Sequence, residues 1–272
     1  MFSVRIGAVA TFATLIIVPA SAIAQQDDAE WLRRCRERSD RGDLVRHCDV
    51  RVHSAQLAAG PIRVDPGPNG GISIVGWNQS GVEVHTRIEA RAESAGGATE
   101  LASEVRITTD GSIRADGPDN TRDSNWHVNF VVFVPARSDL DLSTLNGPLA
   151  VRGVNGRMEL NTSNGPLSLR EVGGDVVARA LNGPLSIILS GTQWDGARLD
   201  AETTNGPLSL TLPRDYNARL ETGTVNGPFD SDVPLTVTLR GRLRGPFTAT
   251  IGQGGPTIRA VTTNGPVHIR SS

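Results

Sequence analysis

The sequence contains no lysine, so all 27 of its basic residues are arginine, and they nearly balance 29 acidic residues. A formal net charge of −2 lacks the positive excess that marks a nucleic-acid-binding surface, so we expect no nucleic-acid partner. Residues 252–255 are glycine-rich but lack the lysine and the spacing of a phosphate-binding loop, and we interpret them as a turn. We attribute the absence of lysine to codon usage in a GC-rich genome rather than to anion recognition by guanidinium groups.

Other residue types that carry chemistry are also scarce. The five histidines show none of the paired spacings of a zinc or iron site, and no Gly-x-Ser-x-Gly nucleophile motif occurs. We therefore expect no catalytic residue, no cofactor and no metal, and we predict that the chain is not an enzyme. Aromatic residues make up only 4 % of the chain, so the core must be filled by Leu, Val, Ile and Ala in thin layers.

Only one long apolar run occurs, and it lies at the start of the chain. Residues 6–20 are apolar after the basic Arg5, and Ala22-Ile23-Ala24 fits the small-residue pattern of a cleavage site. This pattern predicts a signal peptide over residues 1–24 and no transmembrane segment after its cleavage. The mature chain is then expected in the periplasm, at the cell surface or outside the cell.

The chain is rich in one tripeptide, Asn-Gly-Pro. Successive copies lie 18 to 23 residues apart when Arg244-Gly245-Pro246 is counted as a further slot, a period typical of repeat proteins. We expect these residues to form structural corners. The copies are Asn146, Gly147, Pro148; Asn164, Gly165, Pro166; Asn182, Gly183, Pro184; Asn205, Gly206, Pro207; Asn226, Gly227, Pro228; and Asn264, Gly265, Pro266.

Apolar residues alternate with small or polar ones on both sides of each tripeptide, as in Leu149, Ala150 and Val151. A period of two predicts a strand with one buried face before and after each corner. The same parity turns a set of threonines inward, which argues against a flat, exposed threonine ladder of the ice-binding kind. These threonines are Thr144, Thr162, Thr203, Thr224 and Thr262.

The proline in each copy decides between two ways of connecting the strands. Asn-Gly usually forms a tight hairpin, which the residue after glycine closes with its N–H, and proline has no N–H to donate. We therefore predict an all-β, β-solenoid or β-helix-like stack, in which glycine takes a positive φ at each corner and successive coils pair in parallel about 4.8 Å apart. Each asparagine amide would then lie beneath the next. The alternative is an antiparallel meander or a propeller-like sheet with longer loops.

The mature chain divides into three predicted parts. Residues 25–49 form a helical cap, with a short helix from Asp27 or Asp28 through Arg38. Cys35 and Cys48 most simply form a disulfide that stabilises the cap by about 3 kcal/mol, and a metal pair is the less favoured alternative.

Residues 50–138 form an irregular β region, and residues 139–272 form the regular repeats. Within the irregular region, Asn69-Gly70-Gly71 is a degenerate copy of the corner, residues 98–105 form a second short helix, and residues 126–135 are strongly β-prone.

Several segments together resemble a known bacterial family. They are Asn69-Gly70-Gly71-Ile72, Val134-Pro135, the serial Asn-Gly-x-Leu units, Trp194-Asp195-Gly196, and residues 254–258 leading to Thr263-Asn264-Gly265. Their order is similar to that of the domain-of-unknown-function 4097 family, described as "putative adhesins" with β-strand repeats, and the resemblance covers nearly all of the mature chain. It implies an exported, repeat-built β domain at the cell envelope. The glycine that usually follows Asn-Gly in the family is proline here, which should stiffen the corners.

One column of outward residues carries charge. Five residues before the asparagines of the six copies stand Asp141, Glu159, Val177, Asp200, Glu221 and Arg259, and we identify the four acids among them as a possible outer acidic strip. Stacking would bring these carboxylates close enough to repel, so one hypothesis is a site for a cation or a basic partner. The alternative, which we favour, is a solvated face on which Arg179 neutralises Glu159 or Glu202 diagonally.

These observations predict a non-enzymatic, exported protein of the bacterial cell envelope that acts as a structural or adhesin-like interaction module. Its partner would be an unknown envelope protein or glycan. The alternative is a polysaccharide-binding or polysaccharide-active β-helix protein, since β-helices also host such functions. A groove lined by acids together with Trp or Tyr distinguishes the alternative.

Overall fold

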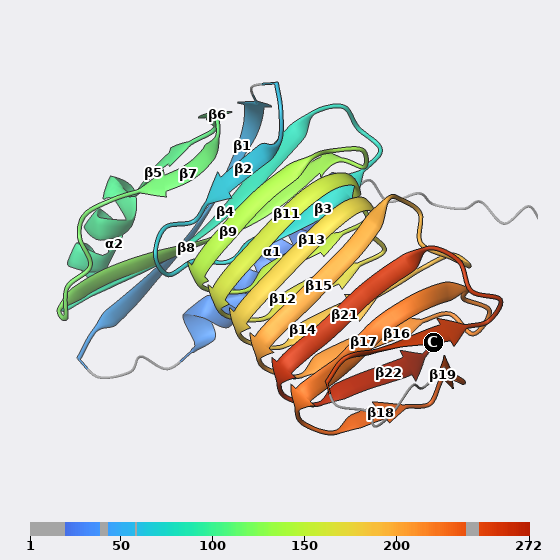
Figure 1. Ribbon diagram of the computed structural model, residues 1–272. Coiled ribbons are helices and arrows are strands. Elements are labelled where there is room, and N and C mark those ends of the chain that lie inside the picture. The colour runs from blue at the N-terminus through green and yellow to red at the C-terminus, as the bar shows by residue number, and fades with distance from the viewer. Residues whose placement is uncertain (1–19, 39–42, 58, 238–244) are drawn as a thin grey trace, which may run out of the picture.

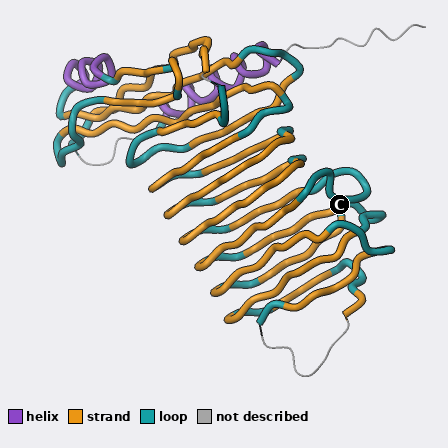
Figure 2. Tube along the Cα trace, turned by 45° about the horizontal axis from the view of Figure 1, so that its top comes forward, coloured by secondary structure: helices purple, strands orange, loops and turns teal. Residues whose placement is uncertain are grey.

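The computed structural model describes residues 20–38, 43–57, 59–237 and 245–272. Within these residues the fold is all-β, with two helices and two large sheets of 11 strands each. The strands lie side by side along an elongated stack (Figure 1), and the regular part of this stack consists of evenly spaced rungs (Figure 2). Most of the predicted signal peptide, residues 1–19, lies outside the described residues, and its last residues belong to the first helix.

The elements follow one another along the chain with short connections. They are α1 (Ala20–Glu37), β1 (Val45–Leu57), β2 (Ile62–Asp65), β3 (Ile72–Trp77), β4 (Val82–Ala92), α2 (Ala95–Glu104), β5 (Arg106–Thr108), β6 (Asp110–Gly111), β7 (Ile113–Asp116), β8 (Ser124–Pro135), β9 (Leu140–Asn146), β10 (Leu149–Arg152), β11 (Asn155–Asn164), β12 (Leu167–Arg170), β13 (Gly173–Asn182), β14 (Leu185–Ile188), β15 (Arg198–Asn205), β16 (Leu208–Leu212), β17 (Ala218–Asn226), β18 (Phe229–Ser231), β19 (Thr236–Val237), β20 (Phe247–Ile251), β21 (Thr257–Asn264) and β22 (Val267–Ser271).

Each sheet contains one half of every regular coil. The first sheet has the strand order β18-β22-β16-β14-β12-β10-β3-β8-β4-β1-β6, and the second has the order β19-β20-β17-β21-β15-β13-β11-β9-β2-β7-β5. A long strand of the second sheet ends at the asparagine of a corner, and a short strand of the first sheet begins after its proline. The predicted strand–corner–strand unit is therefore present.

Successive copies pair in parallel and in register. Asn164 lies opposite Asn146, and Leu167 lies opposite Leu149, and the same register continues through the next copies. The degenerate copy at residues 69–71 joins the series, because Ile72 pairs with Leu149. The antiparallel meander is therefore wrong for the Asn-Gly-Pro copies, and the missing proline N–H is the physical reason.

The core lies between the two sheets and consists of aliphatic columns. Leucines such as Leu149, Leu167 and Leu185 are at most 1 % exposed, and each lies above its equivalent in the next coil. Four of the five predicted inward threonines, at positions 144, 162, 203 and 262, are also buried, and Thr224 is half-buried. The thin aliphatic core expected from the low aromatic content is therefore present in the described coils.

The reason for glycine in the corners differs from our prediction. Only Gly265 among the six Asn-Gly-Pro copies has a φ in the left-handed region, at +154°. A Cβ added to Gly165 would lie 2.2 Å from the carbonyl oxygen of Gly147, and one on Gly183 would lie 2.0 Å from that of Gly165. Glycine is thus required because the backbones of neighbouring corners approach too closely for any side chain.

The order of the last coils also differs from the order in the sequence. The final coil, β21 and β22, lies between the coil of β15 and β16 and the coil of β17 and β18, and it pairs in parallel with both. β20 pairs antiparallel with β17 and occupies its other edge. Each strand has two edges, so the final coil can pair with β17 only on the side that faces β15.

The further slot proposed at Arg244-Gly245-Pro246 is not an equivalent corner. Arg244 lies outside the described residues, and Gly245 and Pro246 precede β20, which belongs to the second sheet and runs antiparallel. A true copy would be followed by a parallel strand of the first sheet. The slot therefore shares the tripeptide pattern without the corner geometry.

The N-terminal end of the stack is built differently. β4 pairs antiparallel with β1 on one side and with β8 on the other, and β8 joins the parallel coils through β3. Val128, Phe130 and Val132 on β8 are buried, as the alternation predicted. Both predicted helices exist, although α1 begins at Ala20 rather than at Asp27 or Asp28.

Candidate functional site

The corners form one continuous edge of the stack, which we call the asparagine edge. It comprises residues 68–71, 145–148, 163–166, 181–184, 204–207, 225–228 and 263–266, none of which is charged. In each of the six Asn-Gly-Pro copies the asparagine Nδ2 donates to the Oδ1 of a neighbouring asparagine at 2.8–3.1 Å, and Asn69 accepts at the end of the row, so the predicted amide ladder is present. In stack order the ladder is Asn69, Asn146, Asn164, Asn182, Asn205, Asn264 and Asn226.

Large apolar side chains are exposed on the asparagine edge. Leu145, Leu181 and Val225 each precede a ladder asparagine and are 53 %, 50 % and 58 % exposed. Among the described residues the only other large hydrophobic side chain this exposed is Val52 on β1. These three side chains lie on one uncharged edge, with Ser163, Thr204 and Thr263 at the equivalent positions on the rungs between them.

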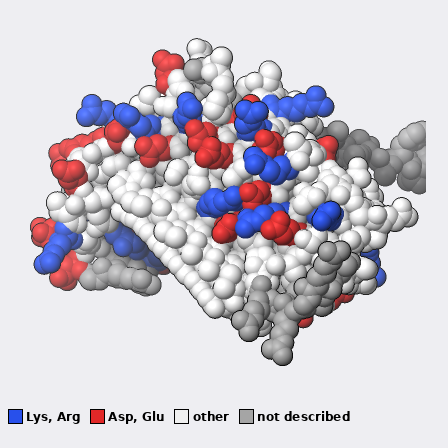
Figure 3. Space-filling view, in the orientation of Figure 1, with Lys and Arg blue, Asp and Glu red and all other residues white. Residues whose placement is uncertain are grey.

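The outer face of the second sheet carries alternating charges. In Figure 3 basic and acidic side chains interleave over the middle of the molecule, beside a broad area without charge. The inserted final coil places Arg259 between Asp200 and Glu221, and its guanidinium contacts these two carboxylates at 2.9 and 3.2 Å. Arg179 contacts Asp200 at 2.6 Å, so among the described residues its ionic partner is Asp200 and not the predicted Glu159 or Glu202. Burial opposes ionisation of Asp200, but these arginines hold the pKa of Asp200 below its ordinary value.

The acidic strip is therefore not one continuous row. Asp141 and Glu159 lie opposite each other on β9 and β11, and Asp141 contacts Arg63 at 2.9 Å. Val177 on β13 separates this pair from Asp200. No group of three or more metal-ligating side chains occurs in the described part of the chain. A role for the strip in binding a cation or a basic partner stays a prediction.

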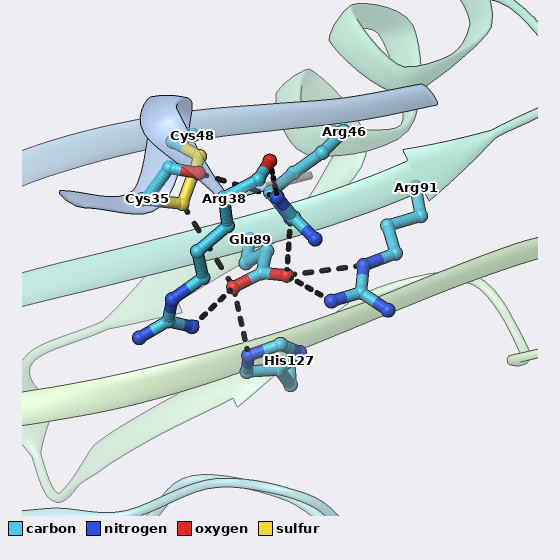
Figure 4. Close-up of a disulfide and its surroundings, with 7 residues drawn as sticks. All are labelled: Cys35, Arg38, Arg46, Cys48, Glu89, Arg91 and His127. Carbon is cyan, nitrogen blue, oxygen red and sulfur yellow. Dashed lines mark hydrogen bonds and ion pairs between the residues drawn. A yellow bond between two sulfur atoms is a disulfide. The ribbon is translucent and has the colours of Figure 1, made fainter. Parts of the chain in front are cut away.

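The disulfide Cys35–Cys48 joins α1 to β1, with the two Cα atoms 6.3 Å apart. Beside it, the carboxylate of Glu89 is only 2 % exposed and accepts hydrogen bonds from Arg46 at 2.8 Å and from Arg91 at 2.5 Å (Figure 4). Burial would raise the pKa of Glu89, but the nearby cations hold that pKa below its ordinary value. The cluster therefore keeps a buried carboxylate charged next to the disulfide.

A second ionic cluster holds α1 on the sheet. Asp28 on α1 contacts His85 Nδ1 and accepts from Arg87 Nε at 2.8 Å, and His85 Nε2 lies 2.8 Å from Glu83. Burial would lower the pKa of His85, but the two carboxylates raise the pKa of His85 above its ordinary value. His85 and Glu89 project from β4 toward α1, so both clusters act as structural clamps for the helix.

A cleft of about 480 Å³ lies at the opposite corners of the coils, where the chain returns from the first sheet to the second. The connection from β14 to β15, residues 189–197, is longer than the preceding ones and folds back over them. Asn155 Nδ2 donates to Asp195 Oδ2 at 2.9 Å, and Trp194 Nε1 donates to the Gly174 carbonyl at 3.2 Å. Polar and aromatic side chains share the lining, namely Arg137, Asn155, Glu171, Ser190, Gln193, Trp194, Asp195 and Tyr216.

The sequence reasoning did not identify this cleft as a site. Trp194-Asp195-Gly196 entered the sequence analysis only as part of the family resemblance, and Tyr216 did not enter it. The signal that could have found the cleft is the position of the aromatic residues. The single tyrosine and the only tryptophan of the regular coils both lie in these connections.

No membrane-crossing helix occurs in the ranges that the structure describes, because none of their helices is both long and apolar enough.

No protein-family model matches the chain, and no curated protein matches it. Among solved structures, a "putative cell adhesion protein" from Clostridium sporogenes ATCC 15579 is similar, with 11 % identity, a TM-score of 0.44, and coverage of 84 % of this chain and 100 % of that chain. A "putative adhesin" from Bacteroides fragilis NCTC 9343 has 11 % identity and a TM-score of 0.35, over 83 % of this chain and 97 % of that one.

A "putative lipid binding protein" from Parabacteroides distasonis ATCC 8503 has 8 % identity and a TM-score of 0.30, over 83 % of this chain and 96 % of that one. Similarity of this degree assigns neither a family nor a ligand to the present chain.

Proposed function

We propose that this chain is a non-enzymatic, exported β-solenoid of the bacterial cell envelope, which acts as a structural or adhesin-like interaction module. The parallel, in-register pairing of successive coils supports the solenoid. The disulfide supports export, since disulfides persist in oxidising compartments, and the apolar run at residues 6–20 supports it independently.

The observation that carries this proposal is the asparagine edge. Its amide ladder fixes the corners at regular spacing, and Leu145, Leu181 and Val225 project from it into solvent. A rigid edge loses little conformational entropy when a partner binds, so weak contacts repeated along it can add together. The partner is an envelope protein or a glycan.

The test replaces Leu145, Leu181 and Val225 together by glutamate and measures binding of the full chain to isolated envelope fractions and to purified glycans. We expect a loss of binding of at least tenfold, because charges on the edge must be desolvated at the contact. The matched control is Val52→Glu, which places the same charge on the other exposed large hydrophobic position. Equal binding by the triple variant and the wild type would contradict the proposal that the asparagine edge is the interaction surface.

A second candidate function is favoured by the cleft. The polysaccharide alternative predicts a groove where acids meet Trp or Tyr, and the cleft is lined by Glu171, Asp195, Trp194 and Tyr216. Incubation of the full chain with polysaccharides, followed by analysis of reducing ends, separates the two classes. Turnover would overturn the non-enzymatic proposal, and binding without turnover would support it.

A further inference from the structure

Glu171, at the mouth of the cleft, has an unfavourable backbone conformation. Its φ is +54°, and it is the only residue other than glycine with a positive φ in the described ranges. The equivalent position in the preceding coil is Gly153, which has a φ of +67°. Residues other than glycine are strained in this region, and such strain is typically kept where a side chain is needed for function.

Tyr216, in the same cleft, also carries an energetic cost. Its side chain is 1 % exposed, and its hydroxyl has no hydrogen-bond partner among the described residues. A phenylalanine would fill the same space without burying an unsatisfied hydroxyl, which is unfavourable in a core. Burial also raises the pKa of Tyr216 to about 12, so the hydroxyl remains protonated and able to donate.

These two costs fall on one cleft, although they have different physical origins. The chain has one tyrosine and four tryptophans in all, and the other three tryptophans, at positions 31, 77 and 126, lie in the N-terminal region. The regular coils are built from aliphatic residues, and the one tryptophan and the one tyrosine that they contain both line this cleft. Stability optimisation alone favours glycine at 171 and phenylalanine at 216, so ligand binding explains both exceptions together.

The lining indicates the class of ligand. Arg137 is offset by Glu171 and Asp195, so the cleft has no strong excess of one charge sign for an ionic ligand. The hydrogen bond between Asn155 and Asp195 fixes the orientation of both side chains and leaves the Oδ1 atom of each without a partner in the described structure. Fixed donors and acceptors suit hydroxyl groups, while Trp194 and Tyr216 are 3 % and 1 % exposed and form the buried floor beneath them. The volume also lies within the roughly 300–1,000 Å³ range of small-ligand pockets.

We propose that this cleft binds a neutral, hydroxyl-rich ligand, a short segment of a glycan, with Glu171 as a hydrogen-bonding residue at the mouth and the covered hydroxyl of Tyr216 as a donor that the ligand reaches by displacing the side chains over it. The inference rests on the proposed function as a binding module and assigns its ligand class. The proposal predicts opposite effects of each substitution on stability and on binding. Glu171→Gly and Tyr216→Phe should each raise the melting temperature of the full chain while weakening its binding to the ligand.

The experiment uses cellotriose, maltotriose and tri-N-acetylchitotriose as probes, with saturation-transfer NMR and calorimetry on the full chain. We expect at least one of them to bind. Tyr216→Phe should weaken that binding about three- to tenfold, the range for one lost neutral hydrogen bond, and Glu171→Gly should weaken it at least about tenfold, because hydrogen bonds to a charged acceptor are stronger. A trimer of glucuronic acid, which keeps the ring hydroxyls of the glucose probes and replaces each C6 hydroxyl by a carboxylate, should bind less well beside the two carboxylates of the cleft.

Two control variants separate binding from stability. Thr86→Val removes another buried hydroxyl without a partner, on β4 and away from the cleft lining, and should raise the melting temperature without changing binding. Glu159→Gln removes an acidic group outside the cleft and should change neither quantity.

Failure of all three neutral probes to bind, or variants that gain stability with unchanged affinity, would overturn the proposal. The asparagine-edge variant tests the interaction module separately. If the edge variant loses envelope binding while the full chain binds none of the sugars, the proposed function as an interaction module is supported and the proposed glycan ligand is wrong.

Discussion

The regular coils and the N-terminal region stabilise their strands by different means. In the coils every rung repeats the same contacts, with asparagine bonded to asparagine and the glycine of one corner packed against the carbonyl of the next. In the N-terminal region one disulfide and two buried ionic clusters hold α1 against β1 and β4. In the coils the free energy of folding is distributed over many equivalent contacts, so loss of one contact should destabilise the coils less than it destabilises the N-terminal region.

Removal of Glu89 should show this difference most strongly. Glu89→Ala deletes the acceptor that Arg46 and Arg91 share in the interior, and we expect the free energy of unfolding to fall by about 3–5 kcal/mol. The matched change in the coils is Asp141→Ala, whose ion pair with Arg63 is 42 % and 64 % exposed, and it should cost at most about 1 kcal/mol. Urea denaturation measures both variants, and similar losses would contradict the contrast between the regions.

Loss of the disulfide should be the next largest effect. Replacing Cys35 and Cys48 by serine should lower the stability of the α1 region by about 3 kcal/mol, because the closed loop of the unfolded chain is released. Hydrogen exchange should report faster exchange in α1 and β1 and unchanged exchange in β11 and β13. Uniform loss of protection would mean that the coils depend on the N-terminal region.

A close corner glycine tests the repeated contacts directly. In Gly165→Ala the new Cβ would lie 2.2 Å from the carbonyl oxygen of Gly147, and we expect a loss of about 1–3 kcal/mol in thermal denaturation. Gly183→Ala should behave alike, since its Cβ would meet the equivalent oxygen at 2.0 Å. Gly81→Ala meets no atom within 4 Å and serves as the control, with a change within about 0.5 kcal/mol.

The smallest expected effect is a pH dependence of the α1 clamp. Both ring nitrogens of His85 contact carboxylates, those of Asp28 and Glu83, which raise the pKa of His85. The resulting stabilisation is complete below the unfolded pKa of about 6.5 and is lost as the pH rises through the raised folded pKa.

Burial lowers the pKa of His127, so its contribution to stability rises with pH until the unfolded-state histidine is deprotonated; this contribution is the same in the wild type and in His85→Gln and cancels from their comparison. The melting temperature of the wild type should thus fall more between pH 6 and pH 9 than that of His85→Gln. Parallel curves for the two proteins would contradict this reading of the clamp.

The corner pattern was predictable because it is local and repeated. Alternation around each Asn-Gly-Pro placed Leu149 and Leu167 inside, and the proline excluded the hairpin, which made parallel columns the expected outcome. Our prediction that glycine is needed for a positive φ was wrong for most corners. φ is a property of one residue, whereas the close contact between Gly165 and Gly147 arises only when the coils stack.

The cleft was missed for a related reason. Its residues come from several connections that differ in sequence, so no single motif marks them. The Glu89 cluster was likewise invisible, because its arginines lie on separate elements and only pairing of β1 with β4 brings Arg46 to Glu89.

By itself, the sequence determined the period of the repeat, the buried face of each strand and the column that each side chain joins, because these follow from alternation and from a proline without an N–H. Only the tertiary structure decided which coil stacks on which. Equivalent repeats have equivalent edges, so the sequence pattern does not show whether β17 or β21 pairs with β15. That choice depends on β20, which pairs along β17 and leaves a single free edge for the final coil.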